Sequence, residues 1–223
     1  MAGLTNNCAM PCIIKRFNLA YFPVAKNACT SLTRLFFEIE NGFPYQNFAI
    51  NGETIYLHTF YHSPLSAEEH IRRTEGMKRI AVVRDPIDRF ISAYRNRVLY
   101  HGEIRNASFE RHSIPSGTPH EPRLNEFVGY LDEYRKIPVI RGHTHPQVKW
   151  LGNDLSRFDH VCTFDRLPEL LSMLRDLTGH NLTLPNAQRS DQRIQIDRLT
   201  PESLAILRKI YAPDYELLRG VYS

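Results

Sequence analysis

The feature that most constrains this chain is a short apolar run followed directly by a helix start. Residues 79–83 read Arg-Ile-Ala-Val-Val, a continuous run typical of a strand buried on both faces. Asp85 and Pro86 follow, a helix-capping residue and then proline at the first helical position. The predicted helix continues to about Tyr100. A buried strand feeding a helix is the basic unit of α/β architectures.

The rest of the chain repeats this alternation of strand-like and helix-like segments. Further strands are predicted over 13–24, 54–60 and 159–164, and helices over 30–40, 66–74, 124–134, 167–177 and from 200 onward. No linker divides these segments, so we expect one domain over 1–223, with 1–12 as a flexible N-terminal segment. Residues 101–122 lack periodicity and are predicted to form a long polar loop, of the kind that serves as a lid or mobile insert.

Composition narrows the range of partners. The 223 residues carry a formal charge of +4 with 10 histidines, which fits a local anionic ligand better than a long polyanion. The arginines are spread over several elements, so we expect no nucleic-acid partner. No apolar run is long enough to span a membrane, and the N-terminus does not resemble a signal peptide, so a cytoplasmic location is expected. Cys8 and Cys12 have no second metal-like pair, so no metal site is predicted.

The loop between the first predicted strand and helix is a candidate anion site. It comprises six residues: Lys26, Asn27, Ala28, Cys29, Thr30 and Ser31. Small residues let the backbone approach an anion, and the first N–H groups of the helix point toward it. Lys26 would add a charge, and Thr30 and Ser31 would add hydroxyl donors. The loop has no glycine and its lysine is not next to Ser/Thr, so it is not a Walker A loop. A solvated lysine beside a helix cap is the alternative interpretation.

A second candidate lies after the buried strand. Arg84 falls at the carboxyl end of that strand, where open α/β sheets bind ligands. Ser92 lies about two turns into the next helix. A guanidinium and a hydroxyl could grip one phosphate from two sides. The structural alternative pairs Arg84 with Asp85 or Asp88 and leaves Ser92 in a helix groove.

Together the two segments resemble the phosphosulfate-dependent sulfotransferases, in particular the carbohydrate (family 2) branch. That family has a Pro-Lys-x-Ala/Gly-Cys-Thr-Ser/Asn loop, matched here by 26–31 with alanine in place of proline at position 25. Its Arg-Asp-Pro-x-x-Arg-x-x-Ser-Ala-Tyr segment is matched without a gap by 84–94. Weaker similarities occur in 143–147, 159–167 and 210–218, so the resemblance covers roughly residues 17–218.

The resemblance implies a P-loop-like, three-layer α/β fold with a central, mostly parallel sheet flanked by helices. It implies 3′-phosphoadenosine 5′-phosphosulfate (PAPS) as the cosubstrate and no metal. Lys26, Thr30 and Ser31 would hold the 5′-phosphosulfate, and Arg84 and Ser92 the 3′-phosphate. Residues from a late segment, Arg189 or Ser190, would close over the nucleotide. The implied reaction is in-line sulfuryl transfer to a hydroxyl of a carbohydrate acceptor.

A general base must take the proton of the acceptor hydroxyl, and histidine suits this role near neutral pH. His62 has the spacing to Arg84 expected from the related uronyl sulfotransferases, and His58 and His143 are the other candidates. The sequence does not choose among the three.

Two other functions remain open from sequence. One is a non-catalytic module that binds a nucleotide or an acidic glycan, and the other is a P-loop kinase-like enzyme. The position of the lysine argues against the kinase. The acceptor and the oligomeric state cannot be read from the sequence. Four arginines, at 72, 73, 95 and 97, could line a site for an acidic glycan or simply form solvated helix faces.

Overall fold

The computed structural model describes residues 8–184 and 198–222. The chain forms two compact units. The first, which we call the sheet unit, contains the described residues up to Arg84 and those from Gln147 to residue 184. The second, the helical unit, contains Asp85–Pro146 and the described residues from 198 onward.

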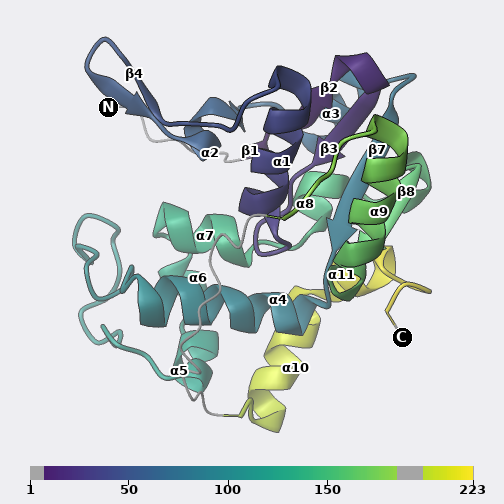
Figure 1. Ribbon diagram of the computed structural model, residues 1–223. Helices are drawn as coiled ribbons and strands as arrows, with labels where there is room; N and C mark the ends of the chain where they lie inside the picture. Colours follow the sequence, from purple (N-terminus) through teal and green to yellow (C-terminus); the bar gives the residue numbers. More distant parts are fainter. Residues whose placement is uncertain (1–7, 185–197, 223) are drawn as a thin grey trace. The chain divides into compact units, whose positions relative to one another are not determined.

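A four-stranded, mostly parallel sheet forms the centre of the sheet unit (Figure 1). Its order is β2 (Cys12–Ile14), β3 (Leu19–Phe22), β7 (Lys78–Val83) and β8 (His160–Thr163). β7 runs parallel to both β3 and β8, and only β2 is antiparallel to its neighbour. The apolar run that the sequence singles out is therefore a central strand, as predicted. The chain is an α/β protein of the expected kind.

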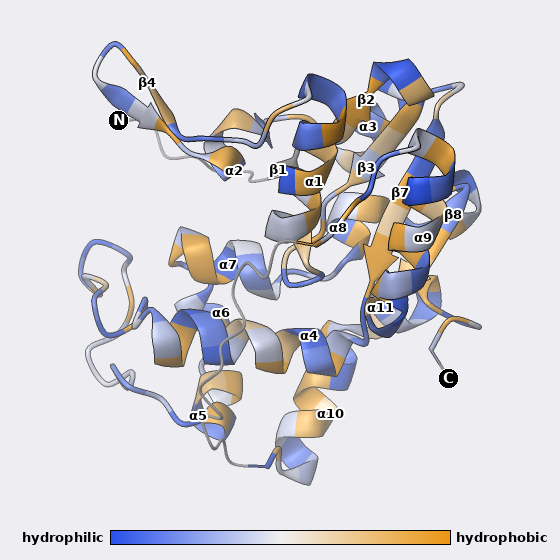
Figure 2. Ribbon diagram, in the orientation of Figure 1, coloured by the Kyte–Doolittle hydropathy of each residue, from blue (hydrophilic) through white to orange (hydrophobic). Residues whose placement is uncertain are grey.

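Helices cover both faces of this sheet (Figure 1). α1 (Cys29–Asn41) and α9 (Leu167–Thr178) pack on the face formed by Tyr21, Ile80 and Val82, in one core cluster. α3 (Ala67–Arg73) and α8 (Val148–Leu151) lie on the opposite face. Figure 2 shows that the helices turn their apolar stripes toward the sheet.

Helix ends in this unit follow the local sequence signals. The predicted capping box is present: Glu69 N–H donates to Ser66 Oγ at 3.3 Å, and Ser66 N–H donates to Glu69 Oε2 at 2.9 Å. α1 ends at Gly42, whose φ of 78° lets its N–H donate to Glu38 O at 2.8 Å. Gly179 ends α9 in the same way.

Two predicted strands are wrong in part. The single strand expected over 13–24 is a tight β2–β3 pair, because η1 (Lys15–Phe17) and the left-handed Asn18 reverse the chain between them. The strand expected over 54–60 continues only as far as β5 (Glu53–Ile55), which pairs with β4 (Phe48–Ile50) in a hairpin.

After β5 the chain forms one helical turn, α2 (Leu57–Phe60). Leu57 is the buried residue of this turn, and the three residues that follow it are exposed. β6 (His62–Ser63) then pairs with β1 (Cys8–Ala9). Cys12 is buried in β2. The last part of the segment expected to be flexible, residues 8–12, is therefore largely in strands.

The helical unit is built around a core that includes Phe90, Phe127, Tyr134, Leu207 and Tyr211. The helix predicted from Pro86 is present, and its second half is a π-helix. The helices predicted over 124–134 and from 200 onward are each broken in two, at Tyr130 and Tyr211.

The elements of the helical unit are α4 (Pro86–Ala93), η2 (Tyr94–Tyr100), α5 (Leu124–Gly129), α6 (Leu131–Tyr134), α7 (Pro138–Thr144), α10 (Pro201–Ile210) and α11 (Ala212–Leu217). Two short turns, η3 (Leu155–Arg157) and η4 (Phe164–Arg166), belong to the sheet unit.

The predicted loop over 101–122 contains no helix or strand, as expected, but it is firmly anchored within the helical unit. Ile104 is fully buried in the core, and Phe109 and Ile114 are nearly so. Tyr134 Oη donates to the carbonyl of Pro119 at 2.7 Å. The loop is thus a packed part of its unit rather than a loosely attached insert.

In the part of the chain that the structure describes, no helix combines the length and the apolar character needed to cross a bilayer.

Candidate functional site

The predicted anion loop connects β3 to α1 through two left-handed residues. Lys26 has a φ of 70° and Ala28 a φ of 58°, although neither is glycine. Such strain is retained where the surroundings enforce it, often at ligand sites. The turn closes through a hydrogen bond from Asn27 N–H to Val24 O at 3.2 Å, and α1 begins at Cys29. The loop therefore presents small residues and a helix N-terminus, the arrangement that binds phosphate or sulfate esters.

The side chain of Asn27 points into the protein and anchors the loop. Its side chain is fully buried, and Nδ2 donates to Val82 O and to Gln147 Oε1, both at 2.8 Å. Val82 belongs to β7, the strand that leads to Arg84. Asn27 thereby ties the anion loop to the neighbouring strand. Its position within the loop gave no hint of this anchoring role.

Gln147 fixes the backbone of Arg84 at both of its polar groups. Gln147 Nε2 donates to Arg84 O at 2.8 Å, and Arg84 N–H donates to Gln147 Oε1 at 3.2 Å. Gln147 is fully buried, so these bonds are shielded from water. Sequence reasoning noted Gln147 only as part of a motif and assigned it no role.

The Arg84 guanidinium lies against the anion loop. Its Nη1 is 3.4 Å from Lys26 O, and its central carbon lies 4.4 Å from the centre of the Phe164 ring. The aromatic face beneath the guanidinium restrains its orientation. Phe164 is another residue whose contribution the sequence did not reveal. The structure thus brings together the two cations, Lys26 and Arg84, that the sequence placed in separate segments.

His58 is the histidine that meets this loop. It is exposed on α2, and its Nε2 lies 3.0 Å from Thr30 Oγ1 in the first turn of α1. An imidazole, a hydroxyl and a helix N-terminus therefore share one location.

The other two candidate histidines have different surroundings. His62 lies in β6, and among the described residues its buried Nε2 has no hydrogen-bond partner. His143 belongs to the helical unit. Its Nδ1 lies 2.7 Å from Val139 O, and Arg97 Nε donates to its Nε2 at 3.1 Å. Since a carbonyl only accepts, Nδ1 carries the proton, and both ring nitrogens of His143 are engaged.

The remaining predicted site residues lie in the helical unit or outside the described part of the chain. Ser92 is half-buried on α4, in the helical unit, whereas Arg84 belongs to the sheet unit. Their joint contact with one phosphate stays a prediction. Arg189 and Ser190 lie outside the described residues.

Asp85, the acidic residue directly after Arg84, has a structural role. Asp85 caps α4, its Oδ1 accepting from Ile87 N–H at 2.9 Å and Asp88 N–H at 3.0 Å.

The second arginine of this segment, Arg89, is fully buried and donates to the carbonyls of His143 and His145. Burial lowers the pKa of its guanidinium. Arg89 therefore fastens the end of α7 rather than binding a ligand.

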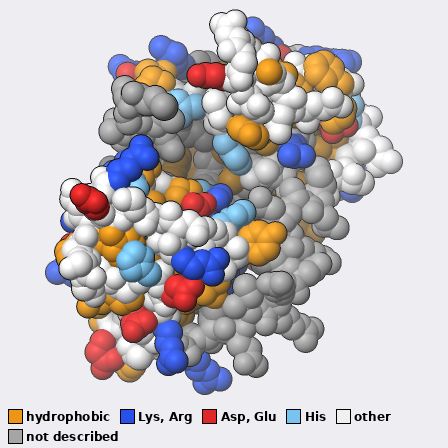
Figure 3. Space-filling model, turned by 90° about the vertical axis from the view of Figure 1, so that its left-hand side faces the viewer, with side chains coloured by type: hydrophobic (Ala, Val, Ile, Leu, Met, Phe, Trp, Pro, Cys, Tyr) orange, Lys and Arg blue, Asp and Glu red, His pale blue; other side chains and the backbone are white. Residues whose placement is uncertain are grey.

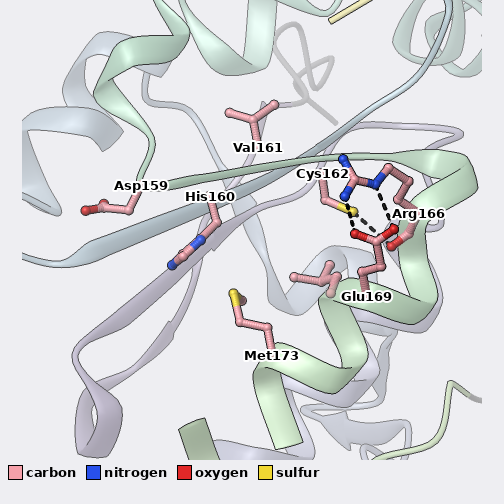
Figure 4. Close-up of a pocket in the computed structure, with 8 residues that line it drawn as sticks. Asp159, His160, Val161, Cys162, Arg166, Glu169 and Met173 are labelled. Atoms are coloured by element: carbon pink, nitrogen blue, oxygen red, sulfur yellow. Dashed lines mark hydrogen bonds and ion pairs between the residues drawn. The ribbon is translucent and has the colours of Figure 1, made fainter. Parts of the chain in front are cut away.

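A shallow pocket of about 320 Å³ opens on the sheet unit beside β8 and α9 (Figure 4). Cys162 Sγ donates to Thr163 O at 3.2 Å, and burial raises the pKa of this thiol. Arg166 Nε donates to Glu169 Oε1 at 2.8 Å across the pocket rim. None of the residues of the anion loop lines it. The lining residues are Asp159, His160, Val161, Cys162, Arg166, Glu169, Leu170 and Met173.

No group of histidine, cysteine or carboxylate side chains in residues 8–184 and 198–222 has an arrangement suited to a metal ion. The site instead offers cations, hydroxyls and a helix N-terminus, which suit an anionic substrate.

Comparison with known proteins identifies one family. The model of the sulfotransferase family matches residues 12–223, nearly the whole chain. No curated protein and no solved structure shows significant similarity to it. The family match spans the anion loop, the segment that begins at Arg84 and His58. On this match the chain belongs to the sulfotransferase family.

Proposed function

We propose that this sulfotransferase transfers the sulfuryl group of PAPS to a hydroxyl of a carbohydrate, with His58 as the general base. The observation that carries the proposal is the convergence of Lys26, Arg84, Thr30 and His58 on one helix N-terminus. An enzyme of this class needs an anion cradle, a cation near the leaving oxygen and a base beside the acceptor.

The donor side follows from the loop. The first N–H groups of α1 and the hydroxyls of Thr30 and Ser31 would hold the 5′-phosphosulfate. Lys26 would stabilise charge on the oxygen that bridges phosphorus and sulfur as that bond breaks. Arg84, held by Gln147 and Phe164, would bind the 3′-phosphate with Ser92.

The acceptor side follows from His58. The acceptor hydroxyl attacks sulfur, the bond from sulfur to the bridging oxygen breaks, and adenosine 3′,5′-bisphosphate leaves. The hydroxyl proton passes to Nε2 of His58. A bound donor would draw the Thr30 hydroxyl away from Nε2, since a phosphosulfate oxygen is the stronger acceptor. We favour His58 over His62 and His143 because it is the histidine in contact with the anion loop.

The test is transfer of ³⁵S from labelled PAPS to a panel of oligosaccharides. Lys26→Ala should lower turnover about 100-fold, the usual effect of removing one transition-state donor. Arg34→Ala is the matched control, because Arg34 is an exposed cation on the outer side of α1. Near-normal transfer by Lys26→Ala would remove this lysine from the mechanism. Nucleotide binding with no transfer to any hydroxyl would favour the non-catalytic module.

A further inference from the structure

Five large apolar side chains are exposed in a short stretch of the sheet unit. Phe43, Phe48, Ile50, Tyr56 and Phe60 are each between 41% and 58% exposed. We call Phe43, Phe48, Tyr56 and Phe60 the aromatic surface. Figure 3 shows hydrophobic side chains exposed on the face of the molecule that includes the hairpin. Apolar side chains gathered in this way mark a binding surface more often than scattered ones do.

The aromatic surface rests on a rigid support. Phe37 and Tyr45 are buried beneath it and meet edge to face, with ring centres 5.0 Å apart. Phe60 contacts both rings, at 5.9 Å from Phe37 and 5.8 Å from Tyr45. Tyr45 Oη also donates to Ile55 O at 2.9 Å, fastening the hairpin to this cluster. Phe60 is therefore preorganised, which lowers the entropic cost of binding at this ring.

The surface adjoins the proposed base. α2 is a single turn, and its buried side chain is Leu57, whereas Tyr56, His58 and Phe60 are all exposed. Tyr56 and Phe60 flank His58 by two residues on either side, and a helix with its side chains is only about 10–12 Å wide. A molecule that places a hydroxyl at His58 and extends by one or two sugar rings therefore meets aromatic side chains.

The segment that carries the aromatic surface, residues 35–71, contains no lysine or arginine of its own. It has instead the five glutamates Glu38, Glu40, Glu53, Glu68 and Glu69. Lys26 and Arg84, the cations of the anion loop, belong to the proposed donor site. An acidic glycan would thus meet like charge, and it would gain little from apolar rings.

We infer that the acceptor is an uncharged glycan, whose apolar C–H faces pack on Tyr56 and Phe60 while one hydroxyl reaches His58. This inference rests on the proposed function. It replaces the acidic glycan considered from sequence with a neutral one. The rings exclude water and bury apolar sugar surface, and a segment with glutamates and no cation of its own discriminates against uronic acids and sulfated chains.

The test compares neutral and acidic acceptors of equal length, namely cellohexaose, maltohexaose and chitohexaose against hexagalacturonate and a hyaluronan hexasaccharide. The full chain is assayed with ³⁵S-labelled PAPS. We expect kcat/KM for the best neutral glycan to exceed that for either acidic glycan by about tenfold or more. With PAPS saturating at every salt concentration, we expect KM for the neutral glycan to change little between 50 and 300 mM salt, because acceptor binding involves no charge pairing.

Variants locate the binding surface. Tyr56→Ala and Phe60→Leu should each raise KM for the neutral glycan about tenfold and leave affinity for adenosine 3′,5′-bisphosphate unchanged. Phe60→Leu keeps apolar volume over Phe37 and Tyr45, so the fold is retained. Ile13→Ala is the control, since Ile13 is exposed on β2 of the same unit.

Preference for an acidic glycan, or an unchanged KM in Tyr56→Ala, would overturn the inference. It would equally be overturned if these side chains instead govern dimerisation or binding to phosphatidylcholine vesicles, since the surface would then belong to a second copy or a lipid. Failure to bind adenosine 3′,5′-bisphosphate would instead overturn the proposed function. The two failures are therefore distinguishable.

Discussion

His58 Nε2 lies 3.0 Å from Thr30 Oγ1, so an imidazole from one segment meets the helix N-terminus of another. The two residues are 28 positions apart in sequence, and the rest of α1 and the β4–β5 hairpin lie between them. This contact places the candidate base beside the anion loop.

Replacing His58 should remove the base without removing the donor site. His58→Gln keeps a polar side chain near Thr30 but cannot accept a proton near neutral pH, so single-turnover transfer should slow by about 100-fold or more. Affinity for adenosine 3′,5′-bisphosphate should stay within about twofold. His62→Gln and His143→Gln serve as matched controls. Should His58→Gln transfer sulfate at nearly the normal rate while His62→Gln does not, His62 would be the base.

Gln147 should matter to the nucleotide site as well as to stability. Gln147→Met preserves volume but leaves the Arg84 backbone and the Asn27 amide without their partner, at a cost of about 2–3 kcal/mol. Arg84 should then lose its fixed position, and affinity for adenosine 3′,5′-bisphosphate should fall. Urea unfolding and calorimetry measure the two effects.

Leu174→Ala provides the comparison for Gln147→Met. Leu174 is fully buried on α9, and its truncation should cost a similar amount, about 2–5 kcal/mol. A leucine side chain offers no hydrogen-bond partner to Arg84, so nucleotide affinity should be retained. Equal affinities in the two variants would reduce Gln147 to a purely structural residue.

The sequence predicted helix ends better than it predicted reversals of the chain. Signals carried by a few adjacent residues were read correctly, as at Ser66, Gly42, Gly179 and Asp85, because capping geometry is set locally. The turn at Asn18 and the helical turn at Leu57 were missed, and a strand was predicted at both places. A short run of apolar residues fits either a strand or a helical turn with one buried side chain, so the pattern alone does not distinguish them.

In the candidate site, too, short segments were identified from sequence, whereas the contacts between segments were not. The anion loop and Arg84 were proposed from residue type and position, and their role in binding a ligand stays a prediction. The bond between Asn27 and Gln147 joins residues 120 positions apart, and no local pattern encodes it. The support of Arg84 by Phe164 is likewise a tertiary contact. Each of the three histidines has a chemically suitable side chain, so our preference for His58 depends on its contact with Thr30 in the fold.

Cys29 should report occupancy of the donor site without knowledge of the acceptor. It is the first residue of α1 and is half-buried in the anion loop. Adenosine 3′,5′-bisphosphate should slow its alkylation by iodoacetamide about tenfold or more, as followed by peptide mass spectrometry.

Two other cysteines act as internal controls in that experiment. Cys162, beside α9, should react at the same rate with and without nucleotide. Cys12 should stay unmodified in the folded protein, since burial raises its thiol pKa to about 12. Identical Cys29 rates at saturating nucleotide would contradict a donor site at this loop.

His70 should make the sheet unit sensitive to mild acid. It is buried on α3, and this burial lowers its pKa below that of an unfolded chain, with Arg73 adding to the effect. Protonation therefore favours the unfolded state. The free energy of unfolding should fall as pH drops through about 6.5, the pKa of unfolded histidine, and below it until the folded pKa is passed.

The check is urea unfolding between pH 7.5 and 5. His70→Gln should flatten the decline, whereas His160→Gln, at an exposed position on β8, should not. If both variants follow the original protein, His70 is not the source of the acid sensitivity.

The most direct test of the account is calorimetric binding of adenosine 3′,5′-bisphosphate, with ADP as the comparison and Arg84→Ala beside the original protein. We predict that the bisphosphate binds about tenfold or more tightly than ADP, and that Arg84→Ala abolishes this preference, because Arg84 is assigned to the 3′-phosphate. Equal affinity for both nucleotides, or an unchanged preference in Arg84→Ala, would contradict the assignment of this loop and Arg84 to a PAPS site.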